Sequence, residues 1–271
     1  MSIGLGIIAS DGVVLAADSE IGSGGDFKGV DQKLAGAISE TAGQLPKLIG
    51  LAGAGSFNYY QSIRLEVIAL IASELGNDQQ SDSRIKNGLE SFMIDFHSKH
   101  VIPYLKTKCP PAVCVLVGTW IDGRGGLWAT DMSTVRPHTF GYEAIGIGAT
   151  PAINLLHGYL EGAQGIQMSI ESAALLACYV VQRSKCEVEG VGQSTNIIIL
   201  GSGGIHFVPR ELILDCERVF DQNYTAFQSE AFYYVSGMRS PLDRTELELA
   251  RKNLDGLRQS IRAIISETPH T

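Results

Sequence analysis

The start of the chain constrains the fold most strongly, because it has the pattern of a β-hairpin. Residues 3–7 alternate isoleucine and leucine with glycine, which is the period of a strand with one bare face. Asp11-Gly12 follows, a dipeptide typical of a two-residue hairpin turn, and residues 13–17 form an apolar return strand. The sequence therefore predicts two antiparallel strands at the N-terminus.

The predicted register of this hairpin places two polar residues near each other. With Asp11 and Gly12 as the turn, Ser2 lies opposite Ile21. Asp18 then lies within a few residues of the start of the chain, at the same end of the hairpin. We expect this end to bring Ser2 and Asp18 together.

After the hairpin, hydrophobic periodicity predicts further strands and two pairs of helices. A glycine-rich loop is expected at 22–29, because glycine disfavours a helix there. The predicted elements are strands at 33–38 and 47–52, helices at 56–75 and 82–100, strands at 113–120, 127–132 and 138–142, helices starting at 150 and spanning 169–185, and strands at 193–200 and 204–208. Paired helices between antiparallel hairpins favour a layered α+β sandwich over a Rossmann-type chain.

Length and spacing predict one main domain with an appendage. A chain of 271 residues has room for one large domain or two small ones. The predicted sandwich ends near 208, so we expect a domain at 1–208 and a helical C-terminal extension at 209–271. Apolar residues between 247 and 264 recur at helical spacing, which predicts a long amphipathic helix in the extension.

Composition excludes several classes of function. The net charge of −8 disfavours a nucleic-acid-binding protein, and the apolar runs are too short to predict a membrane span. The five cysteines are odd in number and form no CxxC pair, so we expect no disulfide framework, no metal site and a cytoplasmic location. No cofactor motif is present either, since the glycine-rich segments match neither GxGxxG nor a P-loop.

Three motifs in order resemble those of proteasome β-type subunits and the bacterial HslV peptidase. They are GIIASDGVVLAADS at 6–19, KGVDQKL at 28–34 and KLIGLAGAGSF at 47–57. AIGIGATPA at 144–152, SIESA at 169–173 and STNIIIL at 194–200 fall where that family has its second helix pair and last strands. The resemblance covers about residues 2–208. It implies the four-layer αββα sandwich of an N-terminal nucleophile (Ntn) hydrolase.

The resemblance also implies a set of catalytic residues. Ser2 takes the place of the N-terminal nucleophile once Met1 is removed, and its α-amine, with an ordinary pKa of ~7.7–8.0, would act as general base. Lys33 matches the catalytic lysine, and Asp18 matches the carboxylate that orients it. Gly53 matches the residue whose backbone N–H completes the oxyanion hole.

This sequence departs from the family pattern at several of its polar positions. Serine replaces the usual threonine as nucleophile, and Ile147 replaces a serine between two glycines. The second aspartate of the family aligns near Val188, which leaves Glu187 or Glu189 as substitutes. Glu20 stands where an arginine is common, so the preference of the substrate pocket does not transfer.

The implied function is a peptidase subunit. We expect a homo-oligomeric ring that hydrolyses peptides or unfolded protein chains. An unfoldase ATPase is a possible partner of this ring. Two alternatives stay open at this stage. The first is a non-catalytic scaffold subunit of the same fold, which Ile147 and the missing aspartate favour. The second is an Ntn amidohydrolase that acts on small amides.

Overall fold

A computed structural model describes residues 2–23, 27–30, 32–39, 46–75, 81–106, 112–160, 168–222 and 244–267. It has two five-stranded antiparallel sheets and flanking helices, so the predicted α+β class is confirmed. The first sheet has the order β10 (Tyr142–Gly146), β1 (Ile3–Ala9), β2 (Gly12–Asp18), β11 (Thr195–Gly201) and β12 (Gly204–Phe207). The second has the order β5 (Leu34–Ser39), β6 (Lys47–Gly55), β7 (Val113–Ile121), β8 (Arg124–Asp131) and β9 (Thr134–Pro137).

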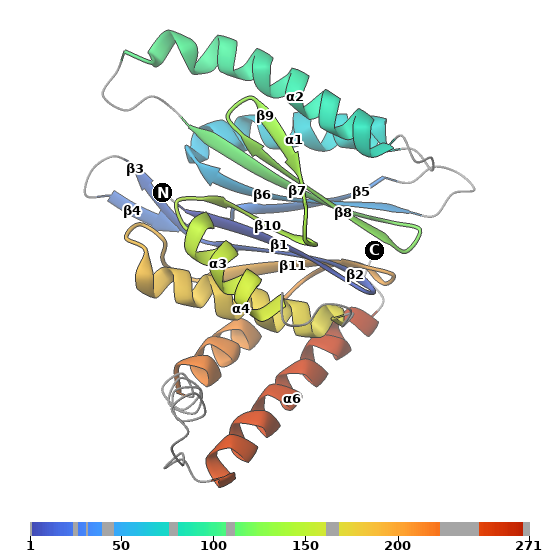
Figure 1. Cartoon of the computed structure of the whole chain (residues 1–271), viewed down its shortest axis with the longest axis vertical. Helices are drawn as coiled ribbons and strands as arrows, with labels where there is room; N and C mark the ends of the chain where they lie inside the picture. The colour runs from blue at the N-terminus through green and yellow to red at the C-terminus, as the bar shows by residue number, and fades with distance from the viewer. Residues whose placement is uncertain are drawn as a thin grey trace.

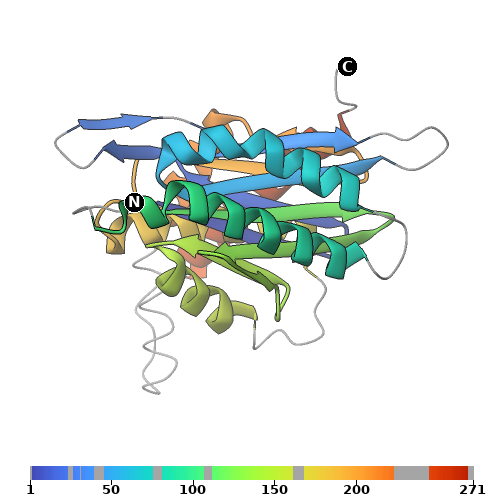
Figure 2. The same ribbon diagram turned by 90° about the horizontal axis from the view of Figure 1, so that it is seen from above.

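Helices cover the outer face of each sheet, and the two sheets face each other (Figures 1 and 2). The second sheet is covered by α1 (Phe57–Glu74) and α2 (Ser81–His100), which a 3-10 turn, η1 (Ile102–Tyr104), follows. The first sheet is covered by α3 (Ala149–Leu160) and α4 (Ile170–Glu187). Residues 210–222 form a further helix, and α6 (Arg244–Ser266) extends from the base of the molecule (Figure 1).

Buried apolar residues form one cluster between the sheets and one under each helix pair. Leu15, Leu116 and Leu200 meet between the sheets. Because both faces of the first sheet are covered, β1 and β2 are buried along nearly their whole length. Their alternating glycine and apolar residues therefore do not mark a solvent-facing side.

The register of the N-terminal hairpin differs from the prediction. Ala9 pairs with Gly12, so Ser10 and Asp11 form the turn and the pairing of Ser2 with Ile21 is wrong. The Asp11 side chain instead accepts a hydrogen bond of 2.8 Å from the N–H of Ile170 at the start of α4. Gly12 lies within β2, where any side chain would collide with the carbonyl oxygen of Leu200. Both residues are thus used for contacts with segments far along the chain.

The glycine-rich segment also differs from the loop that was expected at 22–29. Its described parts form a small antiparallel ribbon of β3 (Glu20–Ser23) and β4 (Phe27–Val30). Residues 24–26 lie outside the described part of the chain. The other predicted elements are present with small shifts at their ends, except the strand at 138–142. That prediction is wrong, because residues 138–141 form a bend between β9 and β10, in which Gly141 has a φ of 80° and donates a hydrogen bond to His138 Nδ1.

The C-terminal helix packs on the outer helices of the first sheet. Leu257 and Ile261 of α6 belong to the cluster beneath α3 and α4, and Arg262 bonds to Glu171 of α4 at 2.6 Å. The division at residue 208 into a domain and an extension stays a prediction. No helix in the described ranges is long and apolar enough to span a membrane.

Candidate active site

Three of the four predicted site residues meet where β1 starts and β2 ends. Asp18 is fully buried, and its Oδ1 accepts hydrogen bonds from Lys33 Nζ at 2.8 Å and from the Ile3 N–H at 3.0 Å. Ser2 precedes Ile3 and is also buried. The antiparallel pairing of β1 with β2 therefore carries Asp18 to the first residues of the chain, and Lys33 joins it from the start of β5.

Lys33 is a buried cation with a matching anion. Only 4% of its side chain is exposed. Burial lowers the pKa of Lys33 from its ordinary value of 10.5, whereas the negative charges of Asp18 and Glu20 act against this shift. The ion pair with Asp18 thus favours the charged ammonium group in a site that excludes water.

Two nearby glycines place their backbone N–H groups differently. The N–H of Gly55 points to Ser2 Oγ at 3.0 Å, whereas the N–H of Gly53 donates to the carbonyl of Lys33 at 2.9 Å. Gly55 has a φ of 99°, which side chains rarely permit, and it ends β6. The structure therefore brings Gly55, rather than Gly53, to the hydroxyl of Ser2.

Gly53 has a packing role in the structure. A side chain at this position would collide with the ring of Tyr60, which is buried on α1. Close contact between β6 and α1 therefore requires a glycine here. The role expected for Gly53 in the oxyanion hole stays a prediction that its observed hydrogen bond does not support.

The backbone of Ser2 is held from the side of β10 and α3. The N–H of Gly148 donates to the Ser2 carbonyl at 3.5 Å, and Gly146, with a φ of 88°, leaves no room for a side chain beside the same oxygen. Ile147, between these glycines, is 47% exposed. The glycines of this motif thus position the backbone of Ser2, and Ile147 supplies no hydroxyl group.

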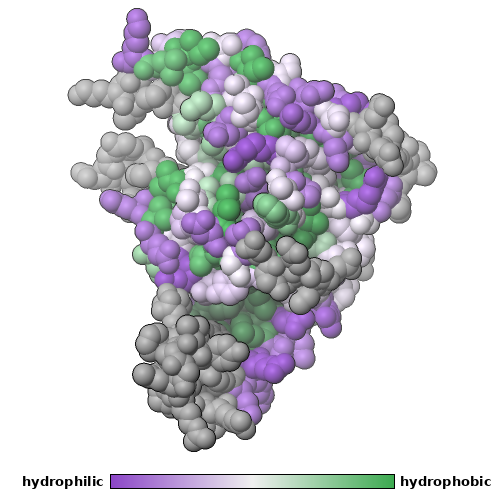
Figure 3. All heavy atoms as spheres, in the orientation of Figure 1, coloured by the Kyte–Doolittle hydropathy of each residue, from purple (hydrophilic) through white to green (hydrophobic). Residues whose placement is uncertain are grey.

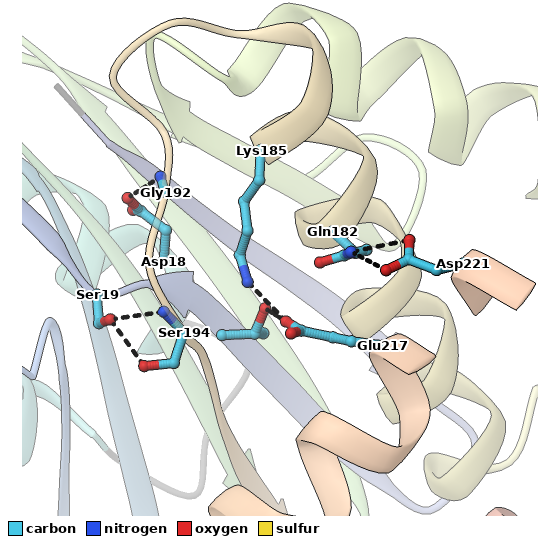
Figure 4. Close-up of polar contacts among 9 residues, drawn as sticks. Asp18, Ser19, Gln182, Lys185, Gly192, Ser194, Glu217 and Asp221 are labelled. Atoms are coloured by element: carbon cyan, nitrogen blue, oxygen red, sulfur yellow. Dashed lines mark hydrogen bonds and ion pairs between the residues drawn. The ribbon is translucent and has the colours of Figure 1, made fainter. Parts of the chain in front are cut away.

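The connection between α4 and β11 closes the site around Asp18 (Figure 4). Asp18 Oδ2 accepts a hydrogen bond from the N–H of Gly192 at 3.2 Å. Beside it, Ser19 and Ser194 bond through their hydroxyls at 3.0 Å, and the N–H of Ser194 donates to Ser19 Oγ at 3.1 Å (Figure 4). Asp18 therefore receives hydrogen bonds on both of its oxygens, an arrangement that stabilises a charged carboxylate.

The acidic residue nearest to this network is Glu20. It is buried, and a side chain at Gly192 would collide with its Oε2. The two residues expected as substitutes for the second aspartate lie elsewhere, since Glu187 pairs with Arg183 at 3.0 Å and Glu189 is exposed. Glu20 therefore brings a second carboxylate close to Lys33.

Sequence reasoning missed Gly55, Gly192 and the position of Glu20. The AGAGS motif contains both Gly53 and Gly55, and only the three-dimensional register of β6 distinguishes them. No local signal joins Gly192 to Asp18, which lies 174 positions away. In the described ranges, no group of three or more His, Cys, Asp or Glu residues could hold a metal ion.

No protein-family model matches the chain, and no curated protein matches its sequence. Solved structures that resemble it include Anbu proteins. Anbu (ancestral beta-subunit) from Yersinia bercovieri has a TM-score of 0.61 at 12% identity, covering 83% of this chain and 95% of that one. Anbu from Hyphomicrobium sp. strain MC1 has a TM-score of 0.58 at 16% identity, covering 83% and 97%.

A third match is the structure described as the helical assembly of the Anbu complex from Pseudomonas aeruginosa. It has a TM-score of 0.59 at 16% identity and covers 89% of this chain and 98% of that one. At these identities the likeness shows the fold alone, which is the fold of the Anbu proteins. It corrects the sequence interpretation, because Anbu is a family separate from HslV and the assignment to the proteasome β-type and HslV-like group is wrong.

Proposed function

We propose that this chain is an N-terminal nucleophile peptidase with the αββα architecture and that Ser2 attacks the peptide bond. The observation that supports this most is the position of Ser2. Its hydroxyl lies 3.0 Å from the N–H of Gly55, and the next residue is bonded to the buried Asp18–Lys33 pair. A hydroxyl nucleophile and a backbone donor are two of the groups that acyl transfer uses, and a nearby cation favours the neutral amine that would serve as the base.

The proposed reaction begins when Met1 is removed and the α-amine of Ser2 becomes free. The neutral amine accepts the proton of Oγ, and Oγ attacks the carbonyl carbon of the substrate. The amine then passes the proton to the departing nitrogen, which leaves an ester between Ser2 and the acyl half. Water attacks the ester with the amine again as base and releases a carboxylic acid. The ammonium group of Lys33 favours the neutral form of the amine.

The oxyanion of the tetrahedral intermediate needs a donor whose partner in the free protein can be displaced by the substrate. Gly55, whose N–H contacts the Ser2 hydroxyl, fits this role better than Gly53, whose N–H donates to the backbone carbonyl of Lys33. When a substrate carbonyl displaces the Ser2 hydroxyl from the Gly55 N–H, that N–H stabilises the developing charge. Loss of one such donor typically lowers the rate by ~10²–10³.

We also propose that the chain forms a homo-oligomer, because the matched Anbu protein from P. aeruginosa is described as a helical assembly. The closed ring, an unfoldase ATPase partner, peptide or unfolded-protein substrates, the domain boundary at 208 and a cytoplasmic location stay predictions. The cysteines at 114, 178, 186 and 216 are free, which is compatible with a reducing compartment.

The experiment compares two chains that differ only in the group before Ser2. A removable N-terminal tag is cleaved so that Ser2 is the first residue, and the matched control retains one extra glycine ahead of it. Intact mass verifies both termini. We expect the first chain to hydrolyse fluorogenic peptides and the control to be inactive, because an acylated nitrogen cannot act as base.

The outcomes separate the proposal from the alternatives. Equal inactivity of both chains on peptides and on a panel of small amides, with assembly intact, would favour the scaffold. Turnover of small amides but not of peptides would favour the amidohydrolase. Retention of Met1 on all of the protein from its native source would overturn the catalytic role of Ser2.

A further inference from the structure

A second region with potential chemistry lies far from Ser2 in the fold, where α6 crosses the outer helices. A cavity of about 780 Å³ is bounded by α3, α4, the helix at 210–222 and α6. Figure 3 shows hydrophobic surface near the junction of α4 and α6, next to the hydrophilic side of α6. This volume falls in the range of ~300–1,000 Å³ that is usual for small-molecule sites.

The inner wall of the cavity is apolar and partly aromatic. It is formed mainly by Leu155, Leu175, Leu176, Tyr179, Phe220 and Leu254. Tyr179 packs edge to face against Phe220, with ring centroids 5.2 Å apart, and against Tyr159, at 5.7 Å. These mutual contacts fix the aromatic side chains, so the wall is preformed for an apolar ligand.

Charged residues line the same cavity, and cations are in excess. Three arginines (Arg183, Arg251 and Arg258) face two carboxylates (Glu187 and Asp255). Arg183 and Glu187 pair with each other at 3.0 Å. Arg258 reaches Asp255 only at 3.7 Å, and Arg251 makes no ion pair with any residue in the described ranges. The cavity therefore presents one cation more than its own anions can neutralise.

Arg258 also carries an atom without a partner. Its Nε is buried and donates no hydrogen bond within the described ranges. A buried N–H group without an acceptor is unfavourable and rare in folded proteins. The Arg258 side chain is 42% exposed, so the rest of its guanidinium group remains accessible. A negatively charged oxygen on a bound molecule would accept from this accessible part and would balance the excess cation.

We infer that the cavity binds a single free fatty carboxylate. Its alkyl chain lies against the leucines and aromatic rings, and its carboxylate accepts from the exposed part of the Arg258 guanidinium, with Arg251 supplying the second positive charge. An apolar chain alone would leave the arginine unpaired, and a small anion would leave the apolar wall hydrated. The ligand would connect α4 and α6 and so stabilise the attachment of the C-terminal helix. This inference does not depend on the chemistry of Ser2.

The test uses the full chain and dodecanoate below its micellar concentration. We expect calorimetry to show one saturable site per chain, and dodecanoate to raise the melting temperature. Dodecanol, with the same chain and no charge, should bind at least about tenfold more weakly, which corresponds to roughly 1.4 kcal/mol. Arg258→Gln should weaken dodecanoate to the same extent. Arg218→Gln is the matched control, because Arg218 pairs with Asp215 outside the cavity, and it should leave binding unchanged.

A second variant tests the apolar wall. Leu155→Trp fills the cavity from α3 and should abolish binding, while circular dichroism verifies that the variant is folded. The inference is overturned if native chain shows no saturable binding, or if dodecanol and dodecanoate bind equally. It is also overturned if the protein binds phosphatidylglycerol vesicles but not monomeric dodecanoate. The inference is overturned as well if a second copy of the chain occupies the cavity. This would be seen as cross-links from Arg251 to that copy together with no binding of dodecanoate.

Discussion

The Ser2 site and the cavity beside α6 both contain cations, yet they differ in how their polar atoms are paired. At the Ser2 site, Asp18 accepts from Lys33, Ile3 and Gly192, and each of its oxygens is used. In the cavity, Arg258 Nε has no partner in the described part of the chain.

This difference indicates what each region can do. A fully paired network has one arrangement, and it holds a reacting group in place before the substrate arrives. A cavity lined by more cations than anions, one of them with an unpaired N–H, can gain stability when an anion binds. We therefore expect the first region to be sensitive to any change in its own residues, and the second to respond mainly to an added molecule.

The largest expected effect separates the two regions completely. Ser2→Ala should lower peptide hydrolysis by at least ~10³-fold, since no other residue supplies the nucleophile, and it should leave dodecanoate binding unchanged. Arg258→Gln should weaken dodecanoate binding and leave peptide hydrolysis unchanged. Kinetics with a fluorogenic peptide and calorimetry with dodecanoate, on the same preparations, measure both. A loss of binding in Ser2→Ala would show that the two regions are coupled.

The next largest effect is on stability, and a pair of matched substitutions measures it. Asp18→Asn places an amide among three donors and removes the anion that is hydrogen-bonded to the buried Lys33, so we expect a loss of ~3–5 kcal/mol in the free energy of unfolding. Glu171→Gln neutralises the partner of Arg262 between α4 and α6, where Arg262 is 65% exposed, and its effect should be much smaller. Urea unfolding of both variants gives the comparison.

The pH dependence of Asp18→Asn provides an independent measurement. Without Asp18, burial lowers the pKa of Lys33 further below its ordinary value of 10.5. Between that lowered pKa and 10.5 the unfolded chain binds more protons than the folded chain, so stability rises with pH. The deficit of Asp18→Asn relative to the native chain should therefore shrink from pH 7 towards pH 10. A constant deficit would mean that Lys33 stays charged and finds another partner.

Part of this site could be predicted from sequence because it depends on local patterns. The N-terminal hairpin brings Asp18 to Ser2 whatever its precise register, and the start of β5 carries Lys33 to the same point. The predicted proximity of Ser2, Asp18 and Lys33 therefore agrees with the structure, although the hairpin register is shifted.

The rest depends on contacts between distant segments, which one sequence does not encode locally. Asp11 and Gly12 are residue types that are typical of a turn, but contacts with α4 and β11 determine where they lie. Gly53 and Gly55 stand in the same motif, and which N–H faces Ser2 follows from the pairing of β6 with β5 and β7. Geometry of this kind is determined only when the sheet is assembled.

An intermediate effect tests the packing role of Gly53. Gly53→Ala pushes a methyl group into the ring of Tyr60, and overpacking of this kind typically costs ~1–3 kcal/mol. Adding Tyr60→Leu should restore much of the stability, and peptide hydrolysis should recover with it, since the Gly55 N–H is unchanged. A structure with a peptide boronate on Ser2 should show a boronate oxygen at the Gly55 N–H. A boronate oxygen at the Gly53 N–H would return the oxyanion role to Gly53.

The smallest effect concerns Tyr60 itself, whose hydroxyl is buried without a partner in the described ranges, like Arg258 Nε. Tyr60→Phe removes that hydroxyl and should leave stability unchanged or raise it by up to ~1 kcal/mol at neutral pH. If Arg258 were merely another tolerated defect, Arg258→Gln would behave in the same way and dodecanoate would not distinguish it from the native chain.

The alkaline limb isolates the contribution of Tyr60. Burial raises the pKa of Tyr60 above its ordinary value of 10.0. Above pH 10 the unfolded chain releases this proton while the folded chain retains it, so native stability falls as pH rises. Tyr60→Phe lacks this proton, whereas Lys33 titrates equally in both chains, so the stability of the variant relative to the native chain should increase above pH 10. Urea unfolding across pH 8–11 measures the difference in stability between Tyr60→Phe and the native chain. A constant difference would show that the Tyr60 hydroxyl reaches water or an acceptor. Tyr60 would then differ from Arg258, whose Nε has no partner in the described ranges.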